Sequence, residues 1–317
     1  MPSIQFYAMG CQMHAILEST ASLATGELAR VPAWFAAWER ILSRFREDSE
    51  LSALNRRAGD GWVQVSETLW EVLTAALSAA RRSRGLVTPT ILPALEGAGY
   101  DRSFADLPRQ VSDTSSGAAQ PATGDWQKIR MDRRRRAVAL PPAIRLDLGG
   151  IAKGWAADTA VQRLSVFGPA LVDAGGDIAI RGTRAGGTPW PIGIADPQRP
   201  DEYLELLLLT GGGVATSGRD VRRWRRGGRE NHHIIDPRNG TPADTDVLTA
   251  TVIAPSAREA EVGAKTALIL GSDAGRAWLA TQPHMAGLLV TEHGRIIRTP
   301  DLAAYCWHEP AIEGVVP

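Results

Sequence analysis

The stretch DLGGIAKGWAAD, residues 147–158, places two adjacent glycines at the start of a predicted helix whose apolar pattern runs through Leu164 towards Gly168. The first N–H groups of a helix have no partner within it and lie at the positive end of its dipole, and Lys153 adds a full charge in the first turn. This combination suits a diphosphate. A close-packed turn with a solvent-facing lysine would leave the same pattern, and the spacing matches neither a Walker A loop nor a dinucleotide G-x-G-x-x-G.

Strand-like segments surround this helix. A second helix is predicted to begin at Ser256, where Glu259 completes a capping box, and to end near Gly271. Strands outnumber the helices that could cross between them and include short hairpins, so we expect an α+β fold with a mixed or antiparallel sheet rather than a doubly wound parallel sheet. The predicted strands are residues 137–140, 170–173, 178–180, 192–194, 203–209, 248–253, 287–291 and 295–298.

Two amphipathic helices are predicted nearer the N-terminus. Apolar residues recur at helical spacing over residues 31–47 and 66–84, with Ser66 as the cap of the second helix. Residues 102–124 are rich in Asp, Ser, Gly and Pro, which favours a long surface connection. We expect one module of 317 residues, with a possible division into halves 1–124 and 125–317.

The composition argues for a small-molecule partner. Lysine plus arginine and aspartate plus glutamate number 35 each, so nucleic acid and anionic membranes are not expected as partners. The basic runs at 133–136 and 222–229 are interpreted as charged hairpin turns. Cys11 and Cys306 are too few for a disulfide framework or a cysteine metal cluster, and the sequence has neither a signal-peptide pattern nor a membrane-length apolar run. We therefore expect a reducing, cytoplasmic compartment.

Several further segments concentrate glycine, hydroxyl, acidic or histidine side chains where the core pattern stops. Each of the first three also fits an ordinary helix cap, loop or tight turn. The adjacent histidines of the last one, close to a carboxylate, suit acid–base chemistry or phosphate contacts, but a lone pair of histidines is more often inert surface. No third His or Cys at ligand spacing supports a zinc site. The segments are SELSALN (49–55), TPTILPALEGAGYD (88–101), DAGGDI (173–178), and TSG (216–218) with HHIIDPRNG (232–240).

These segments, in this order and at these separations, resemble the ApbE family, the FAD:protein FMN transferases. The resemblance runs from MGCQMHAILE at 9–18 to VTEHGRII at 290–297, and LDLGGIAKGWAAD, VDAGGDIAIRG and VATSGRD are among its most specific parts. It implies one compact module of two similar α+β halves, with FAD bound between glycine-rich loops. It also implies a Mg²⁺-assisted reaction in which a threonine hydroxyl of a target protein attacks the FMN-side phosphorus of FAD and AMP is released.

The resemblance also implies roles for individual residues. His233 corresponds to the catalytic base, and Asp236 would orient His233 or the flavin. The carbonyl of Ala152 and the side chain of Glu261 correspond to metal ligands. The implied contacts to FAD come from all the glycine-rich and hydroxyl-rich segments and comprise Ser52, Asn55, Gly99, Asp101, Asp147, Gly149, Gly150, Lys153, Gly176, Asp177, Thr216, Ser217, Gly218 and His233.

Three positions depart from the family pattern. Residues 87–90 read VTPT where the family reads F-D-P-T, and Cys11 stands where the family has a threonine. In the second predicted helix, Glu261 replaces an aspartate ligand of the metal and Lys265 replaces a threonine ligand. A protonated ammonium cannot coordinate Mg²⁺. Two other functions therefore remain open, an FAD-binding protein without transferase activity and an FAD diphosphate hydrolase.

Overall fold

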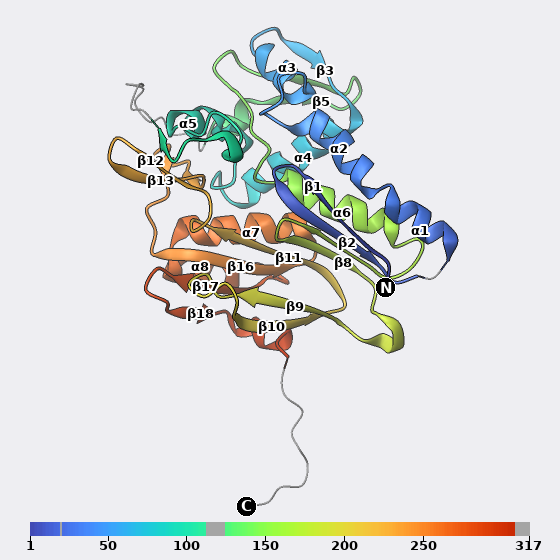
Figure 1. Ribbon diagram of the computed structural model, residues 1–317. Helices are drawn as coiled ribbons and strands as arrows, with labels where there is room; N and C mark the ends of the chain where they lie inside the picture. The colour runs from blue at the N-terminus through green and yellow to red at the C-terminus, as the bar shows by residue number, and fades with distance from the viewer. Residues whose placement is uncertain (20, 112–123, 308–317) are drawn as a thin grey trace, which may run out of the picture.

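The computed structural model describes residues 1–19, 21–111 and 124–307. At its centre is an eight-stranded sheet in which every neighbouring pair of strands is antiparallel (Figure 1). The expected α+β fold with an antiparallel sheet is therefore confirmed. In spatial order the strands are β1 (Ser3–Ala8), β2 (Cys11–Leu17), β7 (Ala170–Ala174), β8 (Asp177–Arg181), β11 (Gly211–Gly218), β16 (Val247–Ala254), β17 (Ala286–Thr291) and β18 (Ile296–Arg298).

Helices α6 (Ala152–Leu164) and α7 (Ala257–Leu270) cover one face of this sheet, and α8 (Ser272–Ala280) follows α7 (Figure 1). The side chain of Ser256 accepts a hydrogen bond from the N–H of Glu259 at 3.4 Å, so it caps α7 as predicted. The predicted capping box would have the Glu259 carboxylate bond back to Ser256. That carboxylate instead reaches Arg82 of a neighbouring helix at 2.5 Å.

The two helices meet closely because Gly154 has no side chain. A Cβ at Gly154 would lie 2.6 Å from the Cα of Arg258, which is closer than carbon atoms pack. Asp158 then accepts hydrogen bonds from two N–H groups at the start of α7, at 2.8 and 3.2 Å. This junction fixes the first turn of α6 against α7 and so brings Lys153 beside Glu261.

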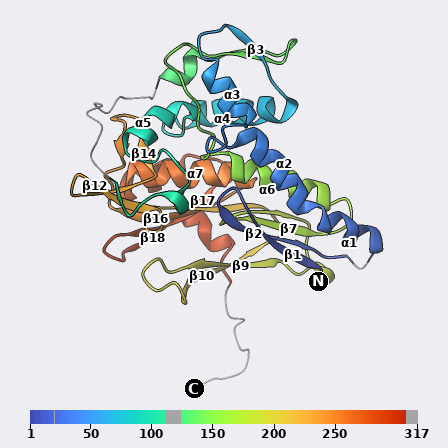
Figure 2. The ribbon, with the colours of Figure 1, turned by 45° about the horizontal axis from the view of Figure 1, so that its top comes forward.

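A second, two-stranded sheet covers the opposite face of the central sheet (Figure 2). It pairs β9 (Trp190–Ala195) with β10 (Tyr203–Leu209) in antiparallel fashion. Since both faces of the central strands are covered, β16 and β17 are buried at every position and do not alternate between buried and exposed residues. The core between the two sheets includes Leu171, Ile180, Trp190, Ile192, Leu207, Leu209, Val214 and Ile253.

Further helices and a small sheet extend the helical side of the molecule (Figures 1 and 2). Ser66 accepts a hydrogen bond from the N–H of Leu69 at 3.2 Å and caps its helix as predicted. These elements are α1 (Ser22–Ala29), α2 (Val31–Leu42), α3 (Glu50–Arg56), α4 (Glu67–Arg82), α5 (Leu92–Gly97), β3 (Trp62–Gln64), β5 (Arg130–Asp132) and β6 (Ala137–Ala139).

The helix predicted over residues 31–47 ends earlier than expected. Ser43 leaves the helical region with φ −79° and ψ 123°, so α2 stops at Leu42. The side chain of Ser43 then accepts a hydrogen bond from the N–H of Phe45 at 3.3 Å. Phe45 therefore does not belong to the apolar stripe of α2, and its side chain is 43% exposed.

The basic run at 133–136 forms the turn between β5 and β6, as interpreted. The interpretation of 222–229 as a turn is wrong, because Arg223–Arg226 form strand β12 and only Gly227 and Gly228 form the turn that leads to β13 (Arg229–His232). The short strands are β4 (Gln110–Val111), β12 (Arg223–Arg226), β13 (Arg229–His232), β14 (Ile235–Asp236) and β15 (Thr241–Pro242). The 3₁₀ turns are Pro89–Ile91, Phe104–Asp106, Asp125–Lys128, Ala185–Gly187 and Pro300–Ala304.

The predicted division at 124/125 falls beside residues 112–123, which lie outside the described part of the chain. Strand β2 from before this point pairs directly with β7 from after it, so one sheet contains strands from both sides. The division into two similar halves stays a prediction. Within the described residues, no helix combines the length and the apolarity that crossing a membrane requires.

Candidate active site

A cavity of about 360 Å³ lies where the end of α2, the start of α6 and the segment after β13 meet. Most of its lining is apolar, but one end carries charged groups. The sequence-predicted residues that line it are Asp147, Gly149, Gly150, Ala152, Lys153 and His233, and Lys265 joins them from α7. The structure therefore brings together residues more than 80 positions apart that the resemblance assigned to one site.

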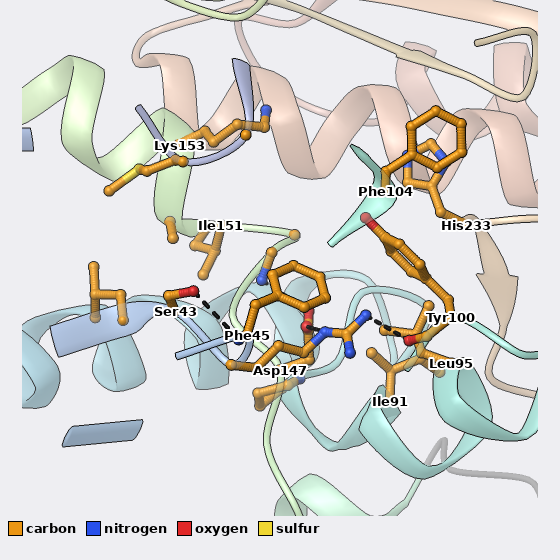
Figure 3. A pocket seen from close by; sticks show the side chains of 18 of the residues that line it. Ser43, Phe45, Ile91, Leu95, Tyr100, Phe104, Asp147, Ile151, Lys153 and His233 are labelled. Carbon is orange, nitrogen blue, oxygen red and sulfur yellow. Dashed lines mark hydrogen bonds and ion pairs between the residues drawn. The ribbon is translucent and has the colours of Figure 1, made fainter. Parts of the chain in front are cut away.

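Aromatic and aliphatic side chains form the apolar end of the cavity. Figure 3 shows the rings of Phe45 and Tyr100 projecting into the space, with Ile91 and Leu95 beneath Tyr100 and with Lys153 on the far side. The ring centroids of Phe45 and Tyr100 are 5.7 Å apart. Such a surface suits a flat ring system, because aromatic faces stack on one another favourably.

Arg44 supports this apolar end, and no sequence motif indicated this role. Its Nε lies 2.7 Å from a carboxylate oxygen of Asp147, and its Nη2 donates to the carbonyl of Tyr100 at 2.8 Å. The guanidinium also lies 4.1 Å from the Phe45 ring centroid and 4.7 Å from that of Tyr100. The side chain is only 4% exposed, so one buried cation links three walls of the cavity. Arg44 lies within the helix predicted over residues 31–47, but α2 ends at Leu42, so helical spacing does not apply to it.

The N–H groups of the turn before α6 form more hydrogen bonds within the turn than the sequence suggested. The N–H of Gly149 donates to the Asp147 carboxylate at 2.8 Å, and the N–H groups of Ile151 and Ala152 bond the Leu148 carbonyl at 3.1 and 2.9 Å. The expectation of several unpaired amides facing a ligand is therefore wrong for these three groups. The positive end of the helix dipole and the lysine charge remain at this end of the cavity.

Four charged side chains form a cluster behind this turn. The Lys153 ammonium forms a close ion pair with Asp177 and lies 3.9 Å from Oε1 of Glu261, while the Lys265 ammonium lies 3.6 Å from the same oxygen. Burial would lower the pKa of Lys153, but the carboxylates of Asp177 and Glu261 together raise it above its usual value. Lys153 therefore stays charged. The sequence placed Lys153 against a ligand, and the structure adds that carboxylates hold it in position.

This cluster does not fit Mg²⁺. The second oxygen of Glu261 accepts the N–H of Gly154 at 3.1 Å, so an N–H donor or a cation already lies beside each oxygen of that carboxylate. Mg²⁺ requires a nearly octahedral set of oxygen ligands, whereas ammonium groups offer only donors. In the part of the chain that the structure describes, no three His, Cys, Asp or Glu side chains come together as a candidate metal site.

His233 lies at the cavity with a buried Nδ1 that has no hydrogen-bond partner. Burial, together with the nearby charges of Arg222 and Lys265, lowers its pKa well below the usual value. The ring is therefore uncharged at neutral pH and able to accept a proton. Asp236 was expected to orient this ring or the flavin. Its carboxylate binds Arg238, which follows β14, at 2.7–3.0 Å.

The other predicted contact residues lie outside the cavity lining. Asn55 accepts the N–H of Leu146 at 2.7 Å and donates to its carbonyl at 2.9 Å, so it positions the segment that carries Asp147. Gly176, with φ of 92°, follows Gly175 in the tight turn between β7 and β8. Away from the lining as well are Ser52 in α3, Gly99 and Asp101 after α5, and Thr216, Ser217 and Gly218 at the end of β11.

His232, next to the candidate base, should make the fold acid-sensitive. It is 8% exposed, its Nε2 lies 3.2 Å from the Ala243 carbonyl, and burial lowers its pKa to about 4. As the pH falls from about 6.5 to about 4, the unfolded chain takes up a proton that the folded chain does not, so up to about 3 kcal/mol of stability is lost. In urea unfolding at about pH 7.5 and about pH 4.5, His232→Gln should shrink the difference between the two stabilities. An unchanged difference would contradict this origin.

The sequence of this chain is similar to those of known proteins. Residues 9–289 match the model of the ApbE family. An FAD:protein FMN transferase of Treponema pallidum is 31% identical over 305 residues, which cover 90% of this chain and 79% of that protein. One from Klebsiella pneumoniae is 28% identical, with 83% and 77% covered.

Solved structures agree with the observed fold. The ApbE protein of Thermotoga maritima superimposes with a TM-score of 0.86 at 27% identity and covers 97% of this chain and 99% of its own. The flavin transferase ApbE of Vibrio cholerae, at 21% identity, shares the fold with a TM-score of 0.76 over 96% of this chain and 99% of its own. Since the family model spans most of the chain and the fold agrees throughout, the protein belongs to the ApbE family.

Proposed function

We propose that this protein is an FAD:protein FMN transferase, which moves FMN from FAD to a threonine hydroxyl of a target protein and releases AMP. The observation that carries the proposal is the composition of the cavity. It combines an aromatic end, formed by Phe45 and Tyr100, with a cationic end formed by Lys153 and Lys265, and His233 stands at its border. A flavin nucleotide has the matching parts, a flat ring system and an anionic diphosphate.

The residues of this chain suggest how the transfer proceeds. The uncharged His233 accepts the proton of the threonine hydroxyl as its oxygen bonds to the FMN-side phosphorus. The phosphorus–oxygen bond on the AMP side breaks at the same centre, and AMP leaves with the bridging oxygen. Phosphoryl transfer depends mainly on positioning and charge neutralisation. Lys153 and Lys265 supply positive charge, and Arg44 holds the aromatic wall and the Asp147 segment in place.

A mass-spectrometric assay tests the proposal. The protein is incubated with FAD and a threonine peptide from a protein that other ApbE-family enzymes flavinylate. We expect the peptide to gain the mass of FMN through a phosphoester, with one AMP released per modified peptide. Free FMN and AMP with an unmodified peptide would instead indicate a diphosphate hydrolase. Bound but intact FAD would indicate a binding protein, and either result would overturn the transferase.

A further inference from the structure

We propose that the ammonium groups of Lys153 and Lys265 neutralise the FAD diphosphate in place of a divalent cation, so that this protein binds FAD without a metal. This inference rests on the proposed function. It starts from the disagreement between the chemistry of the charged cluster and the oxygen ligands that Mg²⁺ prefers. The two lysines lie on different helices, α6 and α7, and both line the same cavity.

The position of Lys265 is fixed by its surroundings. Its side chain is 17% exposed, and its Nζ would lie 2.9 Å from a Cβ placed on Gly150. The ammonium therefore lies against the bare backbone of the turn that opens α6. A lysine four residues after a glutamate often forms only a solvated surface pair. Here Glu261 is 3% exposed, so the pair is buried at the cavity wall.

The ammonium groups of the cluster lie on the side that faces the cavity, where the ligand would bind. Asp177 and Glu261 are each 3% exposed, whereas both lysines are 17% exposed and line the cavity. The carboxylates thus lie behind the ammonium groups. Arg222, which also lines the cavity, adds a further positive charge. An anionic diphosphate meets donors and positive charge, while a divalent cation placed there would meet repulsion from both ammonium groups.

The same arrangement gives the buried Glu261 carboxylate its partners without a metal ion. Its Oε2 accepts the N–H of Gly154 at 3.1 Å, and its Oε1 lies within 4 Å of both lysines. A buried carboxylate requires such partners, because an unpaired charge in the interior is costly. Lys265 therefore serves two purposes, since it satisfies Glu261 and presents charge to the cavity.

The first test uses the unmodified protein. FAD affinity, measured by calorimetric titration, should agree within about twofold in EDTA and in millimolar MgCl₂. Mn²⁺, followed by its electron paramagnetic resonance signal, should stay free when protein is added with or without FAD. A tenfold or larger loss of FAD affinity in EDTA, or stoichiometric Mn²⁺ binding, would overturn the inference. A protein that binds no FAD under either condition would overturn the proposed function itself.

The second test changes Lys265. Lys265→Met should weaken FAD binding about tenfold or more, and MgCl₂ should not restore it, because the charge is lost and no ligand is gained. Lys265→Thr offers an oxygen instead, so its FAD affinity should become Mg²⁺-dependent and Mn²⁺ should bind. The matched control is Lys128→Thr, which changes the chain's remaining lysine, 64% exposed and paired with Asp125. If Lys265→Met binds FAD as well as the control does, the inference is wrong. Melting temperatures identify any variant that fails to fold, in which case the tests on the unmodified protein decide.

Discussion

His233→Ala should lower the rate of FMN transfer by about 10²–10⁴-fold while FAD affinity changes little. The acceptor hydroxyl must lose its proton as it attacks phosphorus, and the uncharged His233 ring at the cavity can take that proton. The remaining charges still position FAD, so binding survives. Single-turnover rates of peptide flavinylation, together with calorimetric FAD titrations, separate the two effects.

The neighbouring histidine provides the control. His232→Gln keeps a donor for the Ala243 carbonyl and leaves His233 in place, so transfer should proceed at nearly the normal rate. An equal loss of rate in both variants would mean that the wrong imidazole was assigned. If His233→Ala lost rate and FAD affinity in parallel, the ring would be a binding group and not the base.

Local signals predicted elements whose boundary residues lie within a few positions of the boundary, whereas strands β1, β2 and β11 of the central sheet were not predicted. Ser256 and Gly271 bound α7 through a cap and a positive φ, and strand β10 matches its prediction at both ends. The end of α2 was missed because its apolar pattern runs on to Phe45. That residue is apolar for a different reason, since it lines the cavity.

The family motifs select residues that line the cavity, and they miss residues whose place depends on distant contacts. Asp147, Lys153 and His233 belong to such motifs and line the cavity, whereas Arg44 lines it but belongs to none of them. Its partner Asp147 is more than 100 positions away, and Tyr100 is 56 positions away, so no local pattern could link them. Similarly, the sequence marked Lys265 as a substitution, but only the packing of α7 against the turn at Gly150 shows where its charge lies.

Lys153→Met should destabilise the fold by about 3 kcal/mol, which is larger than an exposed lysine contributes. The ammonium forms a close ion pair with Asp177 and also lies 3.9 Å from Glu261, and both carboxylates are 3% exposed. Methionine keeps the length and packing of the side chain, so the loss arises from carboxyl groups left in the interior without this partner, including Asp177, whose pKa burial already raises. Lys265 still lies beside Glu261 in this variant. We therefore expect a loss of stability at the lower end of what the removal of one member of a buried ion pair usually costs.

Two further variants make this prediction specific to charge. Lys153→Met combined with Asp177→Asn removes both members of the pair, so urea unfolding should show that the double variant recovers part of the stability lost by the single one. Lys128→Met breaks only an exposed pair with Asp125 and should cost less than about 1 kcal/mol. If Lys153→Met cost no more than Lys128→Met, the cluster would not be the buried charge network described above. If Lys153→Met lowers both the stability and the FAD affinity, the Lys153 ammonium both stabilises the buried carboxylates and binds the ligand.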